Sequence, residues 1–186
     1  YMLVNETGPH VPPGAVDEMI AKASKYANPG DIWVTAGSLP PGVPEDFFAS
    51  LIRMLKAKGV HVVFDATGPS FKLGVKEVPW MLYPEVFEAE RLVGFEIRNF
   101  DMAKRAAMNF LQQGIEYVAL MLENRGSLLS SRSQMVMVSP LKVPVMRVTG
   151  ARSAFCAGLV DGFARGLDLV EIARHASAFR ATYVSH

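Results

Sequence analysis

The sequence has little cysteine and no long hydrophobic run. Its one cysteine, Cys156, cannot form an internal disulfide or a cysteine-pair zinc site, which is typical of a reducing compartment. The small apolar neighbours of Cys156 predict a buried, inert thiol. No apolar stretch reaches the roughly 18 residues of a membrane span, and the first twenty residues lack the zones of a signal peptide. We therefore expect a cytoplasmic protein with no membrane partner.

The sequence also has almost no net charge. Nineteen Lys and Arg residues against eighteen Asp and Glu residues leave a net charge of +1, which favours no nucleic-acid partner. Half of the 186 residues are hydrophobic and 20% are charged, which excludes a disordered chain. Ten methionines are an unusual feature, because several of them lie outside helical patterns.

Hydrophobic periodicity predicts an early βαβ unit. A β-rich run at residues 31–36 is followed by a Pro- and Gly-rich loop at 37–44. A helical stripe over 45–58 then ends at Gly59, and an almost continuous apolar strand covers 60–64. This order implies a parallel sheet that is covered on both faces.

The alternation of strands and helices continues to the end of the chain. The predicted elements are a short strand at 80–82, helical turns at 86–92, a helix at 101–113, a strand at 117–122, a hairpin over 127–138, and helices at 153–165 and 169–184. No repeat or interdomain linker interrupts the pattern. We therefore predict a single α/β domain over residues 1–186, a three-layer sandwich with a mostly parallel sheet.

One turn before a helix has the composition of an anion site. Gly150 and Ala151 are small residues at a helix start, where backbone N–H groups and the helix dipole can converge on an anion. Taken alone, a Gly-Ala turn with Ser153 as N-cap is more often an ordinary helix start. The pattern leaves both interpretations open.

Other polar residues are weaker candidates. His10, His61 and His175 are far apart in the sequence and have no metal-ligand spacing. Asp65 ends a buried strand, so its side chain either faces a ligand crevice or caps the next turn. Asp161 lies one helix face away from the anion turn, and we expect it to be solvated.

Several segments of the chain, beginning with the loop at residues 37–44, resemble a known protein family. The loop reads Gly37-Ser38-Leu39-Pro40-Pro41-Gly42-Val43-Pro44 and is followed by Asp46-Phe47-Phe48. This run resembles the hallmark loop of the PfkB (ribokinase-like) carbohydrate kinases, in particular their phosphofructokinase and tagatose-phosphate kinase branch. Further segments resemble the same branch in the same order: residues 5–9, 79–81, 88–94 and 157–160, with Gly162, Phe163, Gly166 and Leu167.

The resemblance implies a ribokinase-like fold and phosphoryl transfer from ATP, with Mg²⁺, to a sugar or sugar phosphate. It also implies that this chain corresponds to the C-terminal, nucleotide-binding part. The N-terminal portion that binds the sugar would have no counterpart here, and the first residue, Tyr1, is not a natural start.

The chain departs from the family at the anion turn. In the family a Gly-Ala-Gly-Asp turn forms the oxyanion hole, and its Asp is the general base. Here the turn reads Gly150-Ala151-Arg152-Ser153, so a neutral hydroxyl stands at the base position and Arg152 replaces a Gly. The resemblance therefore implies no intact catalytic residue. Gly150 and Ala151 would be remnants of the cofactor site.

The other nucleotide motifs are altered as well. Tyr83-Pro84-Glu85 stands where the family tends to have Lys-Pro-Asn, and Glu85 would repel triphosphate or add a metal ligand. Glu88, three residues on, keeps the acid of the metal and phosphate region and is a weak metal candidate. Of a Gly-containing motif of the family, only Gly126 is retained in this chain. Met121, Glu123 and their neighbours stand at the other positions of that motif.

We interpret the departures as one rebuilt face, because Tyr, Met and Arg are typical of protein interfaces. Its residues would be Tyr83, Glu85, Met121, Glu123, Met146, Arg147, Arg152, Arg180 and Tyr183. The sequence thus predicts a catalytically disabled and engineered kinase fragment that binds a protein or itself through this former nucleotide face, with no tightly bound cofactor.

Two alternatives remain. The chain could be a residual ATP-dependent carbohydrate kinase or nucleotide binder. It could also hold a redesigned small-molecule or metal pocket in which Glu85, Glu88 and Glu123 supply the acids.

Overall fold

The computed structural model describes residues 8–122 and 125–185. Two sequence-based expectations therefore lie outside the described residues: the interface role of Glu123 and the resemblance over residues 5–7. The chain divides into two compact units, Tyr1–Pro79 and Trp80–His186, and each is described by itself. The single domain over residues 1–186 stays a prediction.

The N-terminal unit contains the predicted βαβ arrangement. Its elements are α1 (Ala15–Tyr26), β1 (Ile32–Gly37), α2 (Phe47–Ala57), β2 (His61–Ala66) and α3 (Pro69–Val75). Strands β1 and β2 pair in parallel, from Ile32 opposite His61 to Gly37 opposite Ala66. Helices α2 and α3 pack on β2 through a run of aromatic rings, in which Phe48 and Phe64 are 5.5 Å apart and Phe64 and Phe71 are 5.6 Å apart.

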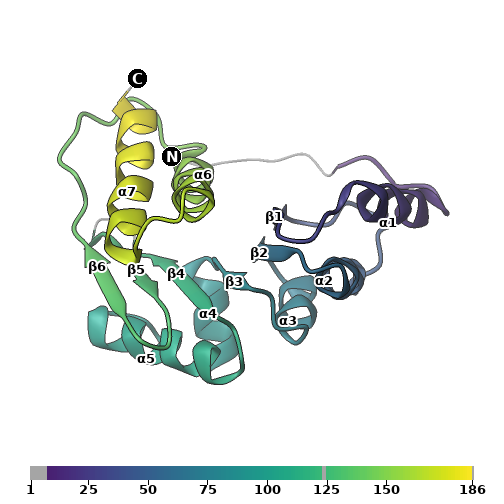
Figure 1. Cartoon of the computed structure of the whole chain (residues 1–186), viewed down its shortest axis with the longest axis horizontal. Coiled ribbons are helices and arrows are strands. Elements are labelled where there is room, and N and C mark those ends of the chain that lie inside the picture. Colours follow the sequence, from purple (N-terminus) through teal and green to yellow (C-terminus); the bar gives the residue numbers. More distant parts are fainter. Residues whose placement is uncertain (1–7, 123–124, 186) are drawn as a thin grey trace. The chain divides into compact units, whose positions relative to one another are not determined.

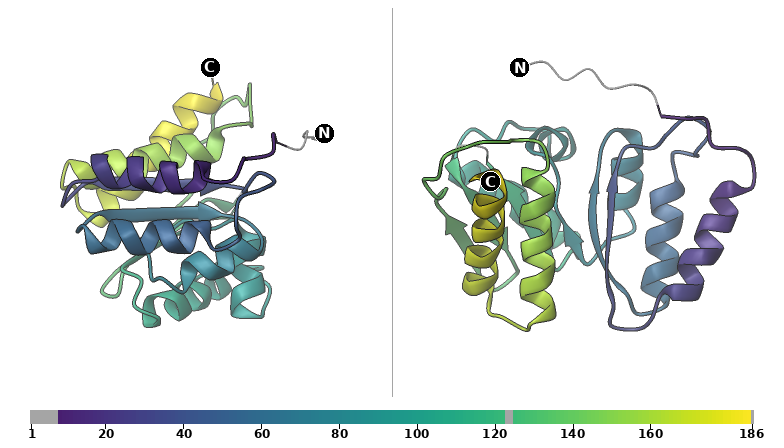
Figure 2. Two further views of the ribbon diagram at one scale, coloured as in Figure 1. Left: turned by 90° about the vertical axis from the view of Figure 1, so that its right-hand side faces the viewer. Right: turned by 90° about the horizontal axis from the view of Figure 1, so that it is seen from above.

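The C-terminal unit is a mixed sheet between two helical layers. Its elements are β3 (Met81–Leu82), α4 (Val86–Val93), α5 (Phe100–Gln112), β4 (Tyr117–Met121), β5 (Ser127–Ser130), β6 (Met135–Val138), α6 (Ala151–Ala164) and α7 (Leu169–Ser185). Helix α5 packs on β4 and β5, while α7 packs on β5 and β6 from the other face (Figure 1). Helices α6 and α7 lie side by side (Figure 2).

The predicted α/β fold with a mostly parallel sheet is confirmed. Strand β3 pairs in parallel with β4, as β1 does with β2. Antiparallel pairing among the described strands is confined to β4 with β5 and β5 with β6, where the sequence predicts a hairpin. The predicted burial of Cys156, on α6, is also confirmed.

The predicted start of α6 is wrong by two residues. The helix begins at Ala151, and its N-cap is Gly150, whose φ of 90° is left-handed. Ser153 is therefore the third residue of the helix, with an exposed side chain, and is not an N-cap. The cause is the backbone freedom of glycine, which lets the chain enter the helix without a side-chain cap.

Within the described part of the chain, no helix combines the length and the apolar character that a membrane crossing requires.

Candidate functional site

Four of the predicted interface residues form one cluster at the start of α6. The Arg152 guanidinium lies over the Tyr83 ring, 4.4 Å from its centroid, and its Nη2 donates a hydrogen bond of 3.1 Å to the Tyr83 carbonyl oxygen. The Nε of Arg152 is 3.8 Å from a carboxylate oxygen of Glu85. The Tyr83 hydroxyl is 3.0 Å from the sulfur of Met121 and 3.3 Å from the carbonyl oxygen of Arg152. We call Tyr83, Glu85, Met121 and Arg152 the turn cluster.

Tyr83 is an interior residue and not a surface one. Its exposed fraction is 0%, and its ring stacks on Phe155 of α6 at a centroid distance of 5.8 Å. The expectation that Tyr83 lies on a contact surface is therefore wrong. The physical reason is that Tyr83 directly follows β3, and α6 covers it through Phe155 and Arg152.

A second tyrosine fills the space beside the turn. The Tyr183 hydroxyl, from α7, donates a hydrogen bond of 3.0 Å to the carbonyl oxygen of Thr149. A Cβ added to Gly150 would clash with that hydroxyl. The guanidinium of Arg147 lies 4.7 Å from the centroid of the Tyr183 ring. Side chains of the protein itself therefore fill the space beside the turn at Gly150, where an anion would have to bind.

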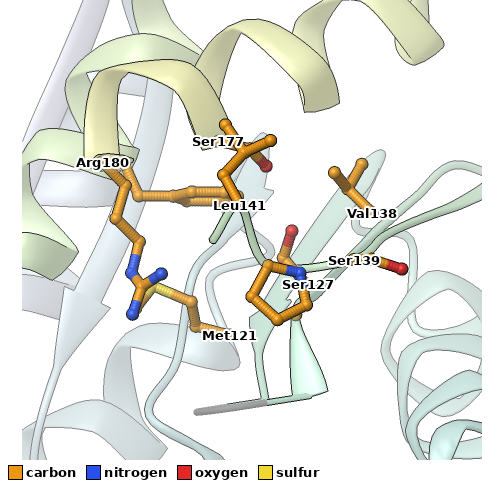
Figure 3. Close-up of a pocket in the computed structure, with 10 residues that line it drawn as sticks. Met121, Ser127, Val138, Ser139, Leu141, Ser177 and Arg180 are labelled. Carbon is orange, nitrogen blue, oxygen red and sulfur yellow. The ribbon is translucent and has the colours of Figure 1, made fainter. Parts of the chain in front are cut away.

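Arg180 closes a small cavity between α7, the sheet and the segment after β6. Residues from all three line this cavity of about 20 Å³: Met121, Gly126, Ser127, Val138, Ser139, Pro140, Leu141, Phe155, Ser177 and Arg180. Figure 3 shows the Arg180 side chain extending from α7 to a position beside Met121. The Nε of Arg180 is buried and has no hydrogen-bond partner among the described residues. A cavity of this size holds about one water molecule.

A larger cleft lies on the other side of the turn cluster. It has a volume of about 390 Å³, and its polar lining consists of Glu85, Glu90, Arg125 and Arg152. Two of these groups are already held by the backbone: Glu90 accepts a hydrogen bond of 2.6 Å from Ile97 N–H, and Arg125 donates to the carbonyl oxygen of Arg98. The cleft thus combines two carboxylates with two guanidinium groups.

The described acids do not gather into a metal site. Glu88 is only 3% exposed and lies 3.9 Å from Arg91. No group of three His, Cys, Asp or Glu side chains within the described residues could hold a metal ion. Gly126, with a φ of 103°, packs so closely on the carbonyl oxygen of Val138 that a side chain there would clash.

Met146 and Arg147 belong to a segment that is neither helix nor strand, residues 139–149. The backbone N–H of Met146 donates a hydrogen bond of 2.7 Å to the carbonyl oxygen of Val184, which ties the segment to the end of α7. The Met146 side chain is 74% exposed. Of the predicted interface residues, Met146 is therefore well placed for contact with another molecule.

A polar contact between α6 and α7 is not expected from the sequence. Asp161 accepts a hydrogen bond of 2.6 Å from His175 and lies 2.8 Å from Arg165, while its side chain stays 34% exposed, so it is solvent-accessible, as expected, and also paired. The hydrogen bond from His175, followed by that from Arg165, keeps the pKa of Asp161 below its ordinary value, although burial opposes the shift. The sequence does contain a signal for this contact, because Asp161 and His175 lie on the two predicted helices that meet near Gly166.

The arrangement of strands and helices defines a class of protein: an α/β fold of the ribokinase type. Residues 5–186 match the model of the pfkB family of carbohydrate kinases, and the chain belongs to this family. It is 30% identical over 183 residues to a 1-phosphofructokinase of Haemophilus influenzae and 30% identical over 168 residues to one of Rhodobacter capsulatus.

The similarity covers nearly all of this chain and little more than half of each relative. The match spans 98% of this chain and 58% of the Haemophilus protein, and 90% of this chain and 53% of the Rhodobacter protein. Among solved structures, phosphofructokinase-2 of Escherichia coli in complex with substrates and products has a TM-score of 0.90 at 21% identity, over 97% of this chain and 59% of that one. This last likeness confirms the ribokinase-like fold.

The residues of this chain do not fit the ATP and Mg²⁺ that the family implies. The cavity beside Arg180, at about 20 Å³, is far smaller than the roughly 300–1,000 Å³ of small-molecule pockets. The cleft of about 390 Å³ is large enough, but its carboxylates, Glu85 and Glu90, would repel a triphosphate. The side chains of Arg152 and Tyr183 pack against the turn itself, and Glu88 belongs to no group of three metal-ligating side chains among the described residues. We therefore derive no phosphoryl-transfer step.

Proposed function

We propose that this chain is the nucleotide-binding part of a PfkB-family protein that no longer binds ATP with Mg²⁺ and that uses its former nucleotide face to contact a protein. That face consists of the turn at residues 148–153, the Arg180 cavity and the segment 139–147. The observation that carries the proposal is the Arg152 side chain, which lies on Tyr83 at a turn where the family has glycine.

The chemistry of the turn supports the loss of phosphoryl transfer. A general base has to accept a proton from the attacking hydroxyl, and Ser153 offers only a neutral, exposed hydroxyl. Tyr83, Glu85 and Arg152 contact one another, so substitutions that are scattered in the sequence act as one unit. Because these residues contact one another, the contacts support the proposal that the face was rebuilt as one unit, by design or by selection.

The exposed apolar side chains support a contact surface. Leu141, Val145, Met146 and Val148 each expose about half or more of their surface on one short segment. Neighbouring exposed apolar groups on a folded protein mark interaction sites, and methionine adapts readily to partners of different shape.

Thermal unfolding with and without ATP and Mg²⁺ tests the loss of nucleotide binding. A ligand that binds the native state raises the melting temperature. We expect no rise at about millimolar ATP, because the turn and the cavity are filled by the chain's own side chains. A rise that disappears in Glu88→Gln would contradict this half of the proposal, since Glu88 belongs to the family's phosphate and metal region.

Sedimentation velocity tests the simplest version of the contact surface, a second copy of this chain. We expect a concentration-dependent dimer that Met146→Asp dissociates and that Met108→Asp leaves intact. Met108 is a matched control because it is an exposed methionine on α5, away from segment 139–147. A strict monomer removes the homodimer and leaves a different protein as partner. A dimer that Met146→Asp does not affect contradicts the assignment of the face.

The cleft of about 390 Å³ favours a second candidate function, the binding of a small molecule. Its size falls within the usual range for ligand sites, and Glu85, Arg125 and Arg152 place groups of both charges in its lining. Thermal unfolding with free amino acids as zwitterionic probes tests it: a rise in melting temperature that Glu85→Gln removes would favour this candidate over the contact surface.

A further inference from the structure

The charges of this chain are segregated, although its net charge is nearly zero. Residues 124–160 contain no Asp or Glu, and they contain five cationic side chains: Arg125, Arg132, Lys142, Arg147 and Arg152. Residues 172–185, which form most of α7, also lack acids and contain Arg174 and Arg180. The acids that balance these charges therefore lie elsewhere in the sequence.

The structure brings part of both stretches onto one face of the C-terminal unit. Segment 139–149 runs beside the end of α7 (Figure 1), where Met146 N–H bonds to the Val184 carbonyl and the Tyr183 hydroxyl bonds to the Thr149 carbonyl. Leu141 and Arg180 line the same cavity. We call Leu141, Lys142, Val145, Met146, Arg147 and Arg180 the basic face.

Within the described residues, the cations of the basic face have no acidic partners. Among residues 8–122 and 125–185, no acid forms an ion pair with Lys142, Arg147 or Arg180. Arg180 is partly buried, and its Nε has no hydrogen-bond partner among those residues. A buried guanidinium donor without an acceptor is costly. An acceptor from outside the chain would remove that cost.

The geometry around Arg180 favours a carboxylate as the acceptor. Guanidinium groups bind carboxylates through paired, charge-assisted hydrogen bonds. The cavity of about 20 Å³ beside Arg180 has room for one small polar group, and the hydroxyls of Ser127 and Ser177 belong to its lining (Figure 3). One carboxylate oxygen is of that size.

The apolar part of the basic face restricts the partner further. Leu141, Val145 and Met146 are exposed and aliphatic, and they alternate with Lys142 and Arg147 along the chain. Binding of single-stranded nucleic acid relies on aromatic side chains that stack on bases, and the exposed large hydrophobic residues of this face are not aromatic. A ligand that matches both properties carries acidic and apolar groups in close alternation.

We propose that the basic face binds an acidic, apolar segment of a partner protein, with one Asp or Glu carboxylate paired to Arg180. This inference rests on the proposed function, because it names the chemistry of the partner for the same face. Complementary charge gives such a contact its specificity and its rate of association, and the aliphatic side chains give it buried area.

Fluorescence polarisation tests the proposal with labelled peptides of about twelve residues. The probe alternates Glu or Asp with Leu and Phe, and its control replaces each acid with Lys. We expect saturable binding of the acidic peptide that weakens as salt is added, and no binding of the lysine peptide. Arg180→Gln should weaken binding by about tenfold, which is the loss of one charge-assisted pair. Arg174→Gln, on an exposed position of the same helix, should leave it unchanged.

Three results would overturn the inference. The first is absence of binding by the acidic peptide, and the second is binding that neither Arg180→Gln nor Met146→Asp affects. The third is tighter binding of a single-stranded oligonucleotide or of vesicles containing phosphatidylserine, which would assign another class of partner. The acidic peptide could fail to bind while ATP still causes no thermal shift and Met146→Asp still dissociates a dimer. In that case the proposed function stands, and only the acidic chemistry of the partner is wrong.

Discussion

The guanidinium of Arg152 lies 4.4 Å from the centroid of the Tyr83 ring and donates a hydrogen bond to the carbonyl oxygen of the same tyrosine. The pair joins the first turn of α6 to the end of β3, two segments that are 69 positions apart. The pair therefore fixes the position of the turn before α6 relative to the end of β3.

Replacing Arg152 should destabilise the protein, although this residue stands at a functional turn. Arg152→Ala removes one hydrogen bond and one cation–π contact, so we expect a loss of about 1–2 kcal/mol in the free energy of unfolding. Arg132→Ala is the matched control, because Arg132 is exposed at the β5–β6 turn, and it should change the value by less than about 0.5 kcal/mol. Urea unfolding measures both. Equal effects would mean that the turn cluster contributes nothing to stability.

Gly150 should tolerate a side chain less well than another glycine with similar backbone geometry. Gly150 has a φ of 90° and packs on the Tyr183 hydroxyl, whereas Gly166 has a φ of 67° and open space around its Cα. Gly166→Ala should cost about 1–2 kcal/mol for the left-handed backbone alone. Gly150→Ala should cost at least about 1 kcal/mol more, because the Tyr183 hydrogen bond is also lost.

A double variant separates the two contributions. In a Tyr183→Ala background, Gly150→Ala should cost no more than Gly166→Ala does, since the clashing hydroxyl is absent. Persistence of the excess cost in that background would show that Tyr183 does not fill the space beside the turn.

The contact between α6 and α7 should make stability depend on pH. Hydrogen bonds from His175 and Arg165 lower the pKa of Asp161 in the folded state. A lowered folded-state pKa contributes stability above the unfolded pKa, and this contribution is lost as pH falls through the folded value. Asp161→Asn should therefore destabilise the protein at about pH 7 and destabilise it less at about pH 2. Denaturant unfolding of both proteins at the two pH values measures this difference, and an equal loss at both would contradict it.

The thiol of Cys156 should be unreactive in the native protein. Its side chain is buried on α6 at 7% exposure, which hinders access of a reagent to the sulfur. We expect 5,5′-dithiobis(2-nitrobenzoic acid) to modify it only as fast as the chain unfolds. Rapid modification at low denaturant would mean that α6 opens locally.

The sequence predicts the elements whose apolar residues repeat at the period of a buried face. The stripe of Phe48, Leu51, Ile52 and Leu55 identifies α2, and the apolar run before Asp65 identifies β2. Helix α1 was not predicted, and the structure gives the reason: it has no buried residue and therefore no apolar stripe of that kind. Helix α3 was missed as well, because it is short and begins at Pro69 beside a turn.

The candidate site was predictable in its residues but not in its contacts. The family resemblance draws attention to Tyr83, Met121 and Arg152, yet no spacing rule indicates that Tyr83 is buried or that it contacts the other two. Such contacts depend on how β3, β4 and α6 pack, which is a property of the tertiary fold. The net charge of the chain was misleading for a similar reason, because a sum over the sequence hides the acid-free stretch at residues 124–160.

The most direct test of the central claim is a calorimetric titration of the wild-type chain with ATP in the presence of Mg²⁺. We expect no saturable heat at about millimolar ATP, because Arg152 and Tyr183 pack against the turn before α6 and the cavity beside Arg180 is only about 20 Å³. Saturable binding of one ATP per chain, weakened by Glu88→Gln, would contradict the account and identify a working nucleotide site.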